Sequence, residues 1–425
     1  MADHEHLCLL TALSPRRDGP NYFSYRGDEL KQLTRTMAKE VVAILGEDDN
    51  IDTIKAVIEE SLEASSSRQG AAWLEEHLGR PRDNAWPPEP LNFEDIYFDT
   101  AVVIGYDEHR TRPVLRRVND FNFELNCWNT LLLDSKDGGE TRILAQTADG
   151  LQRGDPFFCW ERPYQYFEAW MRPSLTSRGI HAFIDDFFRL VDSNRPTSAD
   201  DDDDDCSGLL KCISYGGIEK AYNGSFQWTF AEARTGSAHT AAAIAAGARR
   251  KDLWPAFAED FGTWMAMRPD IWPCVPSGLL LASSSTIELH AEHAGPSVFH
   301  KIPPEVFIQI LRLLSLPDLR VLLQLSHTIS GLVRSLLDET LWHHVHHGDL
   351  RWILPVEGVK GEVDRANDAA RGWYSHPSGF TSVLDSREFP FARFISACVR
   401  SSSMRNRHRL WKIYKQYKVL WEAME

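Results

Sequence analysis

The sequence predicts an α+β fold that is predominantly helical. Apolar residues recur every three or four positions over much of 28–78, as they do along one face of an amphipathic helix. A leucine-rich stretch over 302–342 repeats this periodicity, with proline at the points where helices begin. Between these segments, 91–170 contains short β-rich runs and many aromatic side chains. Two helical parts therefore flank a mixed region.

The N-terminal region, 1–90, is expected to hold two helices. The first helical repeat starts near Leu30, and Asp52 with Thr53 can cap a second helix. The proline-rich stretch 84–90 then breaks the helical run, because proline lacks an amide donor and clashes inside a helix.

The second region, 91–296, is expected to combine short strands with helices. The run 97–104 is β-rich, and helical character returns over 170–190 and around 256–267. An acidic loop at 198–206 contains six consecutive aspartates, from Asp200 to Asp205. Like charges in such a block repel one another, which favours a solvated, flexible insertion. A contact for a basic partner is the alternative.

Composition and charge exclude several classes of protein. The chain has 425 residues and a formal net charge of −15, from 46 Lys and Arg against 61 Asp and Glu, which argues against nucleic-acid binding. The seven cysteines are scattered and form no Cys-x-x-Cys pair, as is typical of reduced thiols. No apolar run approaches the ~20 residues of a membrane span, and no secretory signal begins the sequence. We therefore expect a cytoplasmic or nuclear protein without membrane contact.

The stretch 302–342 has the most specific pattern. Of its 41 residues 21 are apolar, and 12 of these are leucine. Pro-Pro-Glu at 303–305 opens a first helix, Ser-Leu-Pro-Asp at 315–318 ends it and begins a second, and a third is expected to start at 326–330 and to close at Trp342. Helices this short cannot bury all these side chains among themselves, so some apolar surface must meet the rest of the chain or another protein.

The order and spacing of these residues resemble an F-box. This sequence departs from the family's pattern at 327–329, which reads His-Thr-Ile where two basic residues and Trp are usual, and at Ile302, where Leu is usual. A looser likeness to large fungal F-box proteins lies in the Cys-Trp pair at 127–128 and the Met/Arg-rich segment 404–411. The matching landmarks are Ile302-Pro303-Pro304-Glu305, Leu314, Leu316-Pro317-Asp318-Leu319, Leu325-Ser326 and Leu341-Trp342.

The resemblance implies a three-helix F-box at 297–345, toward the C-terminal half of the chain. It further implies a non-catalytic substrate-recognition subunit of an SCF-type (cullin–RING) ubiquitin ligase. The F-box would dock on the adaptor subunit, and through it on the cullin, while the rest of the chain binds an unknown protein substrate. A protein-interaction scaffold, whose F-box-like helices are internal core, is the alternative. The positions expected to contact the adaptor are Ile302, Pro303, Val306, Ile310, Leu311, Leu314, Pro317, Leu319 and Leu322.

The sequence gives no catalytic, cofactor or metal site. It contains no nucleophile elbow, Walker loop, dinucleotide fingerprint or His-Glu-x-x-His motif, although an enzyme within 91–296 remains an alternative. Cys127 and Cys159 lie among aromatic residues, which favours structural burial over a nucleophilic role. His343, His344, His346 and His347 are interpreted as a polar, partly exposed helix end, with a metal-binding or pH-sensing role as the alternative.

The C-terminal region, 346–425, is expected to end in a basic amphipathic helix. Nine Lys and Arg residues stand against one acid over 387–420. We expect a helix that packs on its domain through one face and presents its basic residues outward; a contact with an acidic partner, such as the acidic loop, is the alternative. The apolar face comprises Leu410, Tyr414, Tyr417, Trp421 and Met424, and Arg409, Lys412, Lys415 and Lys418 belong to other faces.

Overall fold

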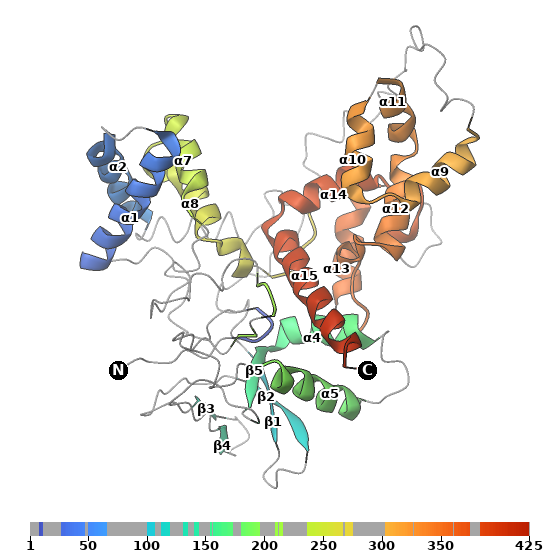
Figure 1. Ribbon diagram of the computed structural model, residues 1–425, viewed down its shortest axis with the longest axis horizontal. Helices are drawn as coiled ribbons and strands as arrows, with labels where there is room; N and C mark the ends of the chain where they lie inside the picture. The colour runs from blue at the N-terminus through green and yellow to red at the C-terminus, as the bar shows by residue number, and fades with distance from the viewer. Residues whose placement is uncertain are drawn as a thin grey trace. The chain divides into compact units, whose positions relative to one another are not determined.

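The computed structural model has a mainly helical α+β architecture, as the sequence predicts (Figure 1). The chain separates into two compact units, whose boundaries are Arg268/Pro269 and His408/Arg409. Unit 1 holds the described residues up to Arg268 and from Arg409 onward, and unit 2 holds Pro269–His408. The structure describes 8–11, 27–46, 50–65, 100–106, 112–119, 131–134, 140–143, 154, 156–172, 180–195, 209–210, 212–215, 236–266, 268–274, 302–325, 327–359, 361–374 and 383–424.

One part of unit 1 is a cluster of helices. It comprises α1 (Gly27–Leu45), α2 (Ile51–Ser65), α7 (Ala238–Ala245), the 3-10 turn η5 (Arg250–Leu253), α8 (Trp254–Asp260) and the 3-10 turn η6 (Thr263–Ala266). The first two helices confirm the expected pair at the N-terminal end. Trp254 donates its indole hydrogen to the carbonyl of Ser61, and buried Asp260 accepts the amide of Thr240 at 2.8 Å, so polar contacts join helices that are distant in sequence.

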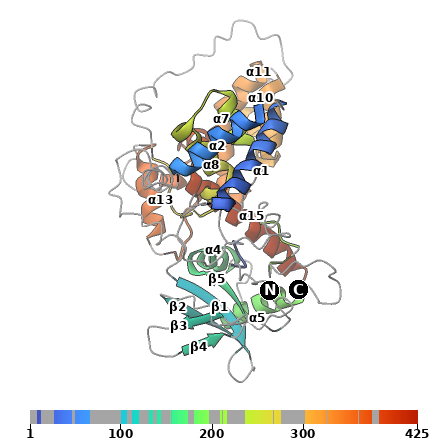
Figure 2. The ribbon, with the colours of Figure 1, turned by 90° about the vertical axis from the view of Figure 1, so that its left-hand side faces the viewer.

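The second part of unit 1 is a small antiparallel sheet with two helices packed against it (Figure 2). β1 lies between β2 and β5, and Val102 pairs with Arg117 on one side and Cys159 on the other. Phe157 and Phe187 meet at 5.3 Å between ring centres in the aromatic core. The elements are β1 (Thr100–Tyr106), β2 (Pro113–Asn119), β5 (Phe157–Trp160), α4 (Glu161–Met171) and α5 (Ile180–Ser193), with a separate hairpin of β3 (Leu131–Asp134) and β4 (Glu140–Ile143).

The N-terminal segment 8–11 is buried in unit 1 against residues near the C-terminal end of the chain. The hydroxyl of Tyr417 donates to the carbonyl of Leu9 at 2.9 Å. Arg409 donates to the carbonyls of Thr11 and Tyr215, the latter at 3.0 Å. Main-chain carbonyls of a buried loop need such donors, so these side chains satisfy the segment's hydrogen-bonding groups.

The described residues of unit 2 form helices and the loops that connect them. Its first four helices include the predicted F-box region, and the first turns of α15 complete the unit. The elements are α9 (Pro304–Leu313), α10 (Leu316–Leu325), α11 (His327–Ser335), α12 (Leu337–His347), η9 (Arg351–Ile353), α13 (Glu362–Arg371), η10 (Val383–Asp385), α14 (Phe391–Arg400) and α15 (Ser402–Glu422).

The predicted third helix of the leucine-rich stretch is wrong in its extent. The structure has two helices there, α11 and α12, with a break at Leu336. The Leu336 amide donates to Val333 in a tight turn, and its carbonyl accepts both the amide and the hydroxyl of Thr340. The first turn of α12 is also held from outside, because Asp338 accepts the amide of Ala392 on α14 at 2.8 Å.

Two further expectations need correction. Helical structure begins at Glu161 rather than near Trp170, inside the stretch expected to be β-rich. Arg409 is 5% exposed and faces buried carbonyls, so it does not belong to a basic outer face; Lys412 and Lys415 are exposed as expected. Arg409 is therefore a buried structural residue of α15, whereas the two lysines lie on its exposed face.

Several sequence predictions lie outside the described residues. These are the proline-rich break at 84–90, the Cys-Trp pair at 127–128 and the acidic loop at 198–206. Within the described part of the chain, no helix is both long enough and apolar enough to cross a bilayer.

Candidate functional site

The leucine-rich helices of unit 2 enclose a small core of their own. Phe307 and Leu311 on α9, Leu319 on α10 and Val333 on α11 are buried there, each at most 3% exposed. Burial of large apolar side chains is the main stabilising term in a cluster of this size. The partly buried residues around this core are Ile302, Leu314, Leu316, Leu322, Leu323, Ile329, Leu332 and Leu336.

Local sequence signals fix where the first two helices begin. Pro303 precedes α9, and its carbonyl accepts the amides of Val306 and Phe307, both at 3.0 Å. At the start of α10, the amide of Asp318 donates to the Ser315 hydroxyl and the amide of Ser315 donates to the Asp318 carboxylate, both at 3.3 Å. The Ser315 hydroxyl also donates to that carboxylate at 2.5 Å. This reciprocal pair is a capping box, in which each residue satisfies a free polar group at the helix start.

We expect Ser315→Ala to lower the free energy of unfolding by about 1 kcal/mol, because it removes the side-chain cap of α10. Ser335→Ala is the matched control, since the hydroxyl of Ser335 also bonds the backbone, but donates to the carbonyl of Leu332 at the end of α11. Urea unfolding of both variants measures the difference. Equal loss in the two variants would contradict a specific capping role.

The outer side of α9 is apolar and open to solvent. Val306, Ile310 and Leu313 are 49%, 40% and 87% exposed, and their spacing of four and three residues places them on one face of the helix. On α10, Val321 and Leu325 are 54% and 60% exposed and are spaced by four residues. We call these five residues the α9–α10 apolar surface.

The structure distributes the nine expected adaptor contacts over three environments. Pro303, Val306, Ile310 and Pro317 are exposed, and Ile302, Leu314 and Leu322 are partly buried. Leu311 and Leu319 are 0% and 3% exposed, so they belong to the small core and offer no surface to a partner.

Sequence reasoning missed three exposed members of the surface: Leu313, Val321 and Leu325. The signal for Leu313 was present, since it follows Val306 and Ile310 at helical spacing. The α10 pair carried a weaker signal, because leucine occurs on every side of that short helix and periodicity alone does not separate its faces.

The histidine cluster at the end of α12 has several different environments. His344 is 8% exposed, and burial lowers its pKa, although Asp349 opposes this effect. The ring of His346 contacts the carbonyl of Leu384 at 3.1 Å and packs against Trp342. In the part of the chain that the structure describes, no three His, Cys, Asp or Glu side chains gather as a metal site requires.

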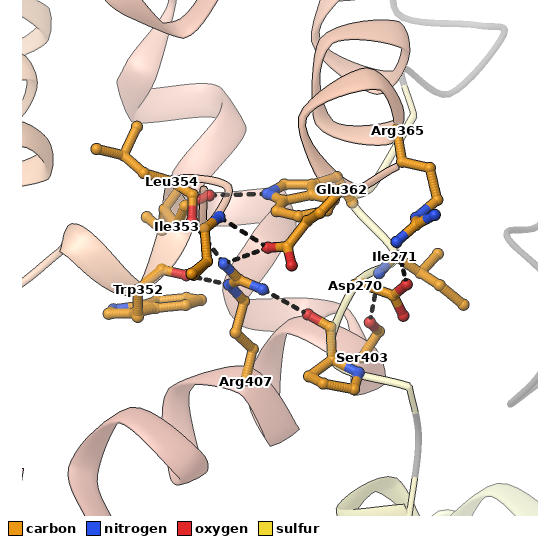
Figure 3. Close-up of polar contacts among 12 residues, drawn as sticks. Asp270, Ile271, Trp352, Ile353, Leu354, Glu362, Arg365, Ser403 and Arg407 are labelled. Carbon is orange, nitrogen blue, oxygen red and sulfur yellow. Dashed lines mark hydrogen bonds and ion pairs between the residues drawn. The ribbon is translucent and has the colours of Figure 1, made fainter. Parts of the chain in front are cut away.

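A second candidate in unit 2 is a buried polar centre around Arg407 (Figure 3). Arg407 and Glu362 both have fully buried side chains and form an ion pair of 2.7 Å. Arg407 also donates to the carbonyls of Trp352, Leu354 and Pro269, the last two at 2.5 and 3.1 Å. All five hydrogen-bond donors of a guanidinium lie in one plane, so a single arginine can hold several chain segments together.

The surroundings of Arg407 extend this polar centre. Glu362, the first residue of α13, also accepts the amide of Val356 at 3.1 Å. Asp270 pairs with Arg365 at 2.7 Å, and the amide of Ile271 donates to Ser403 at 3.1 Å (Figure 3). These contacts join the 269–271 segment, α13 and α15 within unit 2, so their role is to hold chain segments together. We therefore treat the α9–α10 apolar surface as the candidate functional site.

Comparisons with known proteins found no similar protein. No protein-family model matches the chain, and neither a curated protein nor a solved structure matches it significantly.

Proposed function

We propose that this protein is a non-catalytic substrate-recognition subunit of an SCF-type ubiquitin ligase, which docks on the adaptor through α9–α11. The proposal combines the F-box likeness of 302–342 with one structural observation, the exposed apolar face of α9. That face carries Val306, Ile310 and Leu313 on a helix whose opposite side is packed in a core. Single exposed apolar residues are normal, but a helical stripe of three is the pattern that helix-in-groove recognition uses.

In this proposal, one set of residues contacts the adaptor and another set holds the docking helices in place. The α9–α10 apolar surface, with Pro303 and Pro317, provides the anchors that lose water on docking. Leu311 and Leu319 act indirectly, because they hold the two helices together. The Ser315–Asp318 capping box fixes the turn between the helices.

The rest of the chain would bind the protein to be ubiquitinated. Such a receptor raises the effective concentration of substrate lysines near the conjugating enzyme and performs no bond-breaking step itself. Docking on the adaptor links the receptor to the cullin.

The test is a binding measurement between the full-length chain and the purified adaptor. We expect Val306→Lys combined with Ile310→Lys to weaken binding at least about thirty-fold, which corresponds to about 2 kcal/mol for the loss of central anchors. Binding of the wild-type chain should change little with salt, because screening acts on charged rather than apolar contacts. Circular dichroism of the double variant should stay unchanged, since both side chains are exposed.

Val399→Lys is the matched control. Val399 is 56% exposed and lies on α14 of the same unit, so this variant adds a lysine without touching α9 or α10. It should bind the adaptor like the wild type. Absence of wild-type binding at micromolar concentration, or undiminished binding by the double variant, would contradict the receptor proposal and favour a scaffold.

A further inference from the structure

The thiols of Cys8 and Cys159 form a buried pair in unit 1. Both side chains are 0% exposed, and the Cys159 thiol donates a hydrogen bond to the sulfur of Cys8. The two residues come from segments that are far apart in sequence, the N-terminal segment 8–11 and strand β5. Nothing in the proposed docking function uses this pair.

Each of the two segments supplies backbone amides to the other segment's sulfur. The amide of Trp160, next to Cys159, donates to the sulfur of Cys8 at 3.4 Å. In return, the amide of Leu9 donates to the sulfur of Cys159, and the amide of Leu10 is shared between the two sulfur atoms. These reciprocal contacts hold the two sulfur atoms side by side, and Cys159 is fixed on the edge strand β5 by its pairing with Val102 on the central strand β1.

The two thiols differ in acidity. Burial raises the pKa of Cys8, but hydrogen bonds from Cys159, Thr11 and the amides of Trp160 and Leu10 outweigh burial and lower it to about 7. Burial and the proton shared with Cys8 raise the pKa of Cys159 well above its ordinary value. At neutral pH, Cys8 is therefore partly a thiolate, the form that reacts with oxidants, and Cys159 remains a thiol.

We propose that Cys8 and Cys159 are a redox-responsive pair, which closes to an intramolecular disulfide when the protein meets hydrogen peroxide. In such a bond the sulfur atoms lie about 2.05 Å apart, so the hydrogen-bonded pair needs only a local approach. The bond would close a loop of about 150 residues and fix segment 8–11 covalently to β5. Because both thiols are buried, peroxide reaches them through transient local opening of the segment.

The reaction balances with peroxide as the only oxidant. The Cys8 thiolate attacks one peroxide oxygen, which forms an S–O bond, breaks the O–O bond and releases hydroxide that is protonated to water. The Cys159 sulfur then attacks the Cys8 sulfur, which forms the S–S bond and expels the sulfenic oxygen as a second water with the thiol proton. Two thiols lose two electrons in total, and one peroxide gains them.

The experiment treats the reduced, folded full-length chain with hydrogen peroxide, blocks the remaining thiols by alkylation and maps the cysteines by non-reducing peptide mass spectrometry. We expect a peptide pair that joins Cys8 to Cys159 and disappears with dithiothreitol. The melting temperature should rise by about 5 °C or more on oxidation, because a long loop is cross-linked. The rate should increase about tenfold between about pH 6 and about pH 8 and level off above, as the Cys8 thiolate fraction does.

Two variants separate the pair from the other cysteines. Cys8→Ser should abolish the link and leave Cys159 reduced, whereas Cys212→Ser, at an exposed thiol, should leave the link unchanged. A wild-type chain that shows no Cys8–Cys159 peptide after peroxide would overturn the proposal. Oxidation of Cys8 to the sulfinic acid, with Cys159 still open to alkylation, would also overturn the proposal. Both results come from the wild-type protein and need no variant to fold.

Discussion

Arg407→Leu should lower the free energy of unfolding by about 3–5 kcal/mol, one of the two largest losses that we expect from a single substitution in unit 2. The variant leaves the carboxylate of Glu362 fully buried without its cation. It also removes the donor for the carbonyls of Trp352, Leu354 and Pro269. Urea unfolding followed by tryptophan fluorescence measures the loss, since Trp352 lies within the affected centre.

Two controls establish that the uncompensated charge causes this loss. Arg407→Leu combined with Glu362→Leu should recover a large part of the stability, because no charge remains buried and the two sites are coupled. Arg371→Leu removes an ion pair of the same length, 2.7 Å to Asp368, but on the surface of α13, and should change stability by less than about 1 kcal/mol. A similarly small effect of Arg407→Leu would mean that the buried pair is not a structural centre.

Phe307→Ala should destabilise the docking helices by about 3–5 kcal/mol, because it opens a cavity in a core that holds four buried side chains among the described residues. Its neighbour Val306 provides the matched control. Val306→Ala should change stability by no more than about 0.5 kcal/mol, since that side chain is 49% exposed. Hydrogen exchange over α9–α11 locates the effect, and urea unfolding measures its size.

The same two positions separate folding from docking. Phe307→Ala should weaken adaptor binding only as far as it unfolds the helices, so lower temperature should restore binding. The lysine variants of the α9–α10 apolar surface should stay folded and remain weak binders at every temperature. If Val306→Ala proves more destabilising than Phe307→Ala, then the assignment of core and surface on α9 is reversed.

The parts of the fold that local signals determine could be predicted from the sequence. The start of α9 follows from consecutive prolines with a glutamate, and the start of α10 follows from the Ser315–Asp318 capping box. In α4 a signal was present but overlooked, because Glu161 and Pro163 in the first turn favour a helix start. The many aromatic residues around them favoured strands instead.

The features that were missed depend on contacts between distant segments. No glycine or proline marks the break at Leu336; Asp338 and its contact with Ala392 lie outside any local pattern. Arg407 and Arg409 look like members of a basic surface in sequence, because their acceptors are backbone carbonyls, which every residue possesses. The helical period places both arginines among exposed charged residues, because the sequence does not show which backbone carbonyls will lie beside them.

The candidate site falls between these two cases. The sequence indicated that α9 carries more apolar residues than its own core can bury, and Val306 and Ile310 are indeed exposed. It could not assign Leu311 and Leu319 to the core, because the relative rotation of short helices depends on how they pack together. Positions carried over from a family pattern include supporting residues as well as contacts.

The contacts of segment 8–11 also determine when this segment can fold while the ribosome synthesises the chain. Thr11 and Leu9 bond to residues 398 and 408 positions further along the chain. A ribosome that adds about 5–20 residues per second needs roughly 20–80 s to deliver those partners. During that interval the apolar side chains of Leu9 and Leu10 have no final place in the fold, and they are available to chaperones that bind nascent chains. Unit 1 can be completed only when α15 has emerged from the ribosome, so we expect its assembly to be a late step in the folding of these residues.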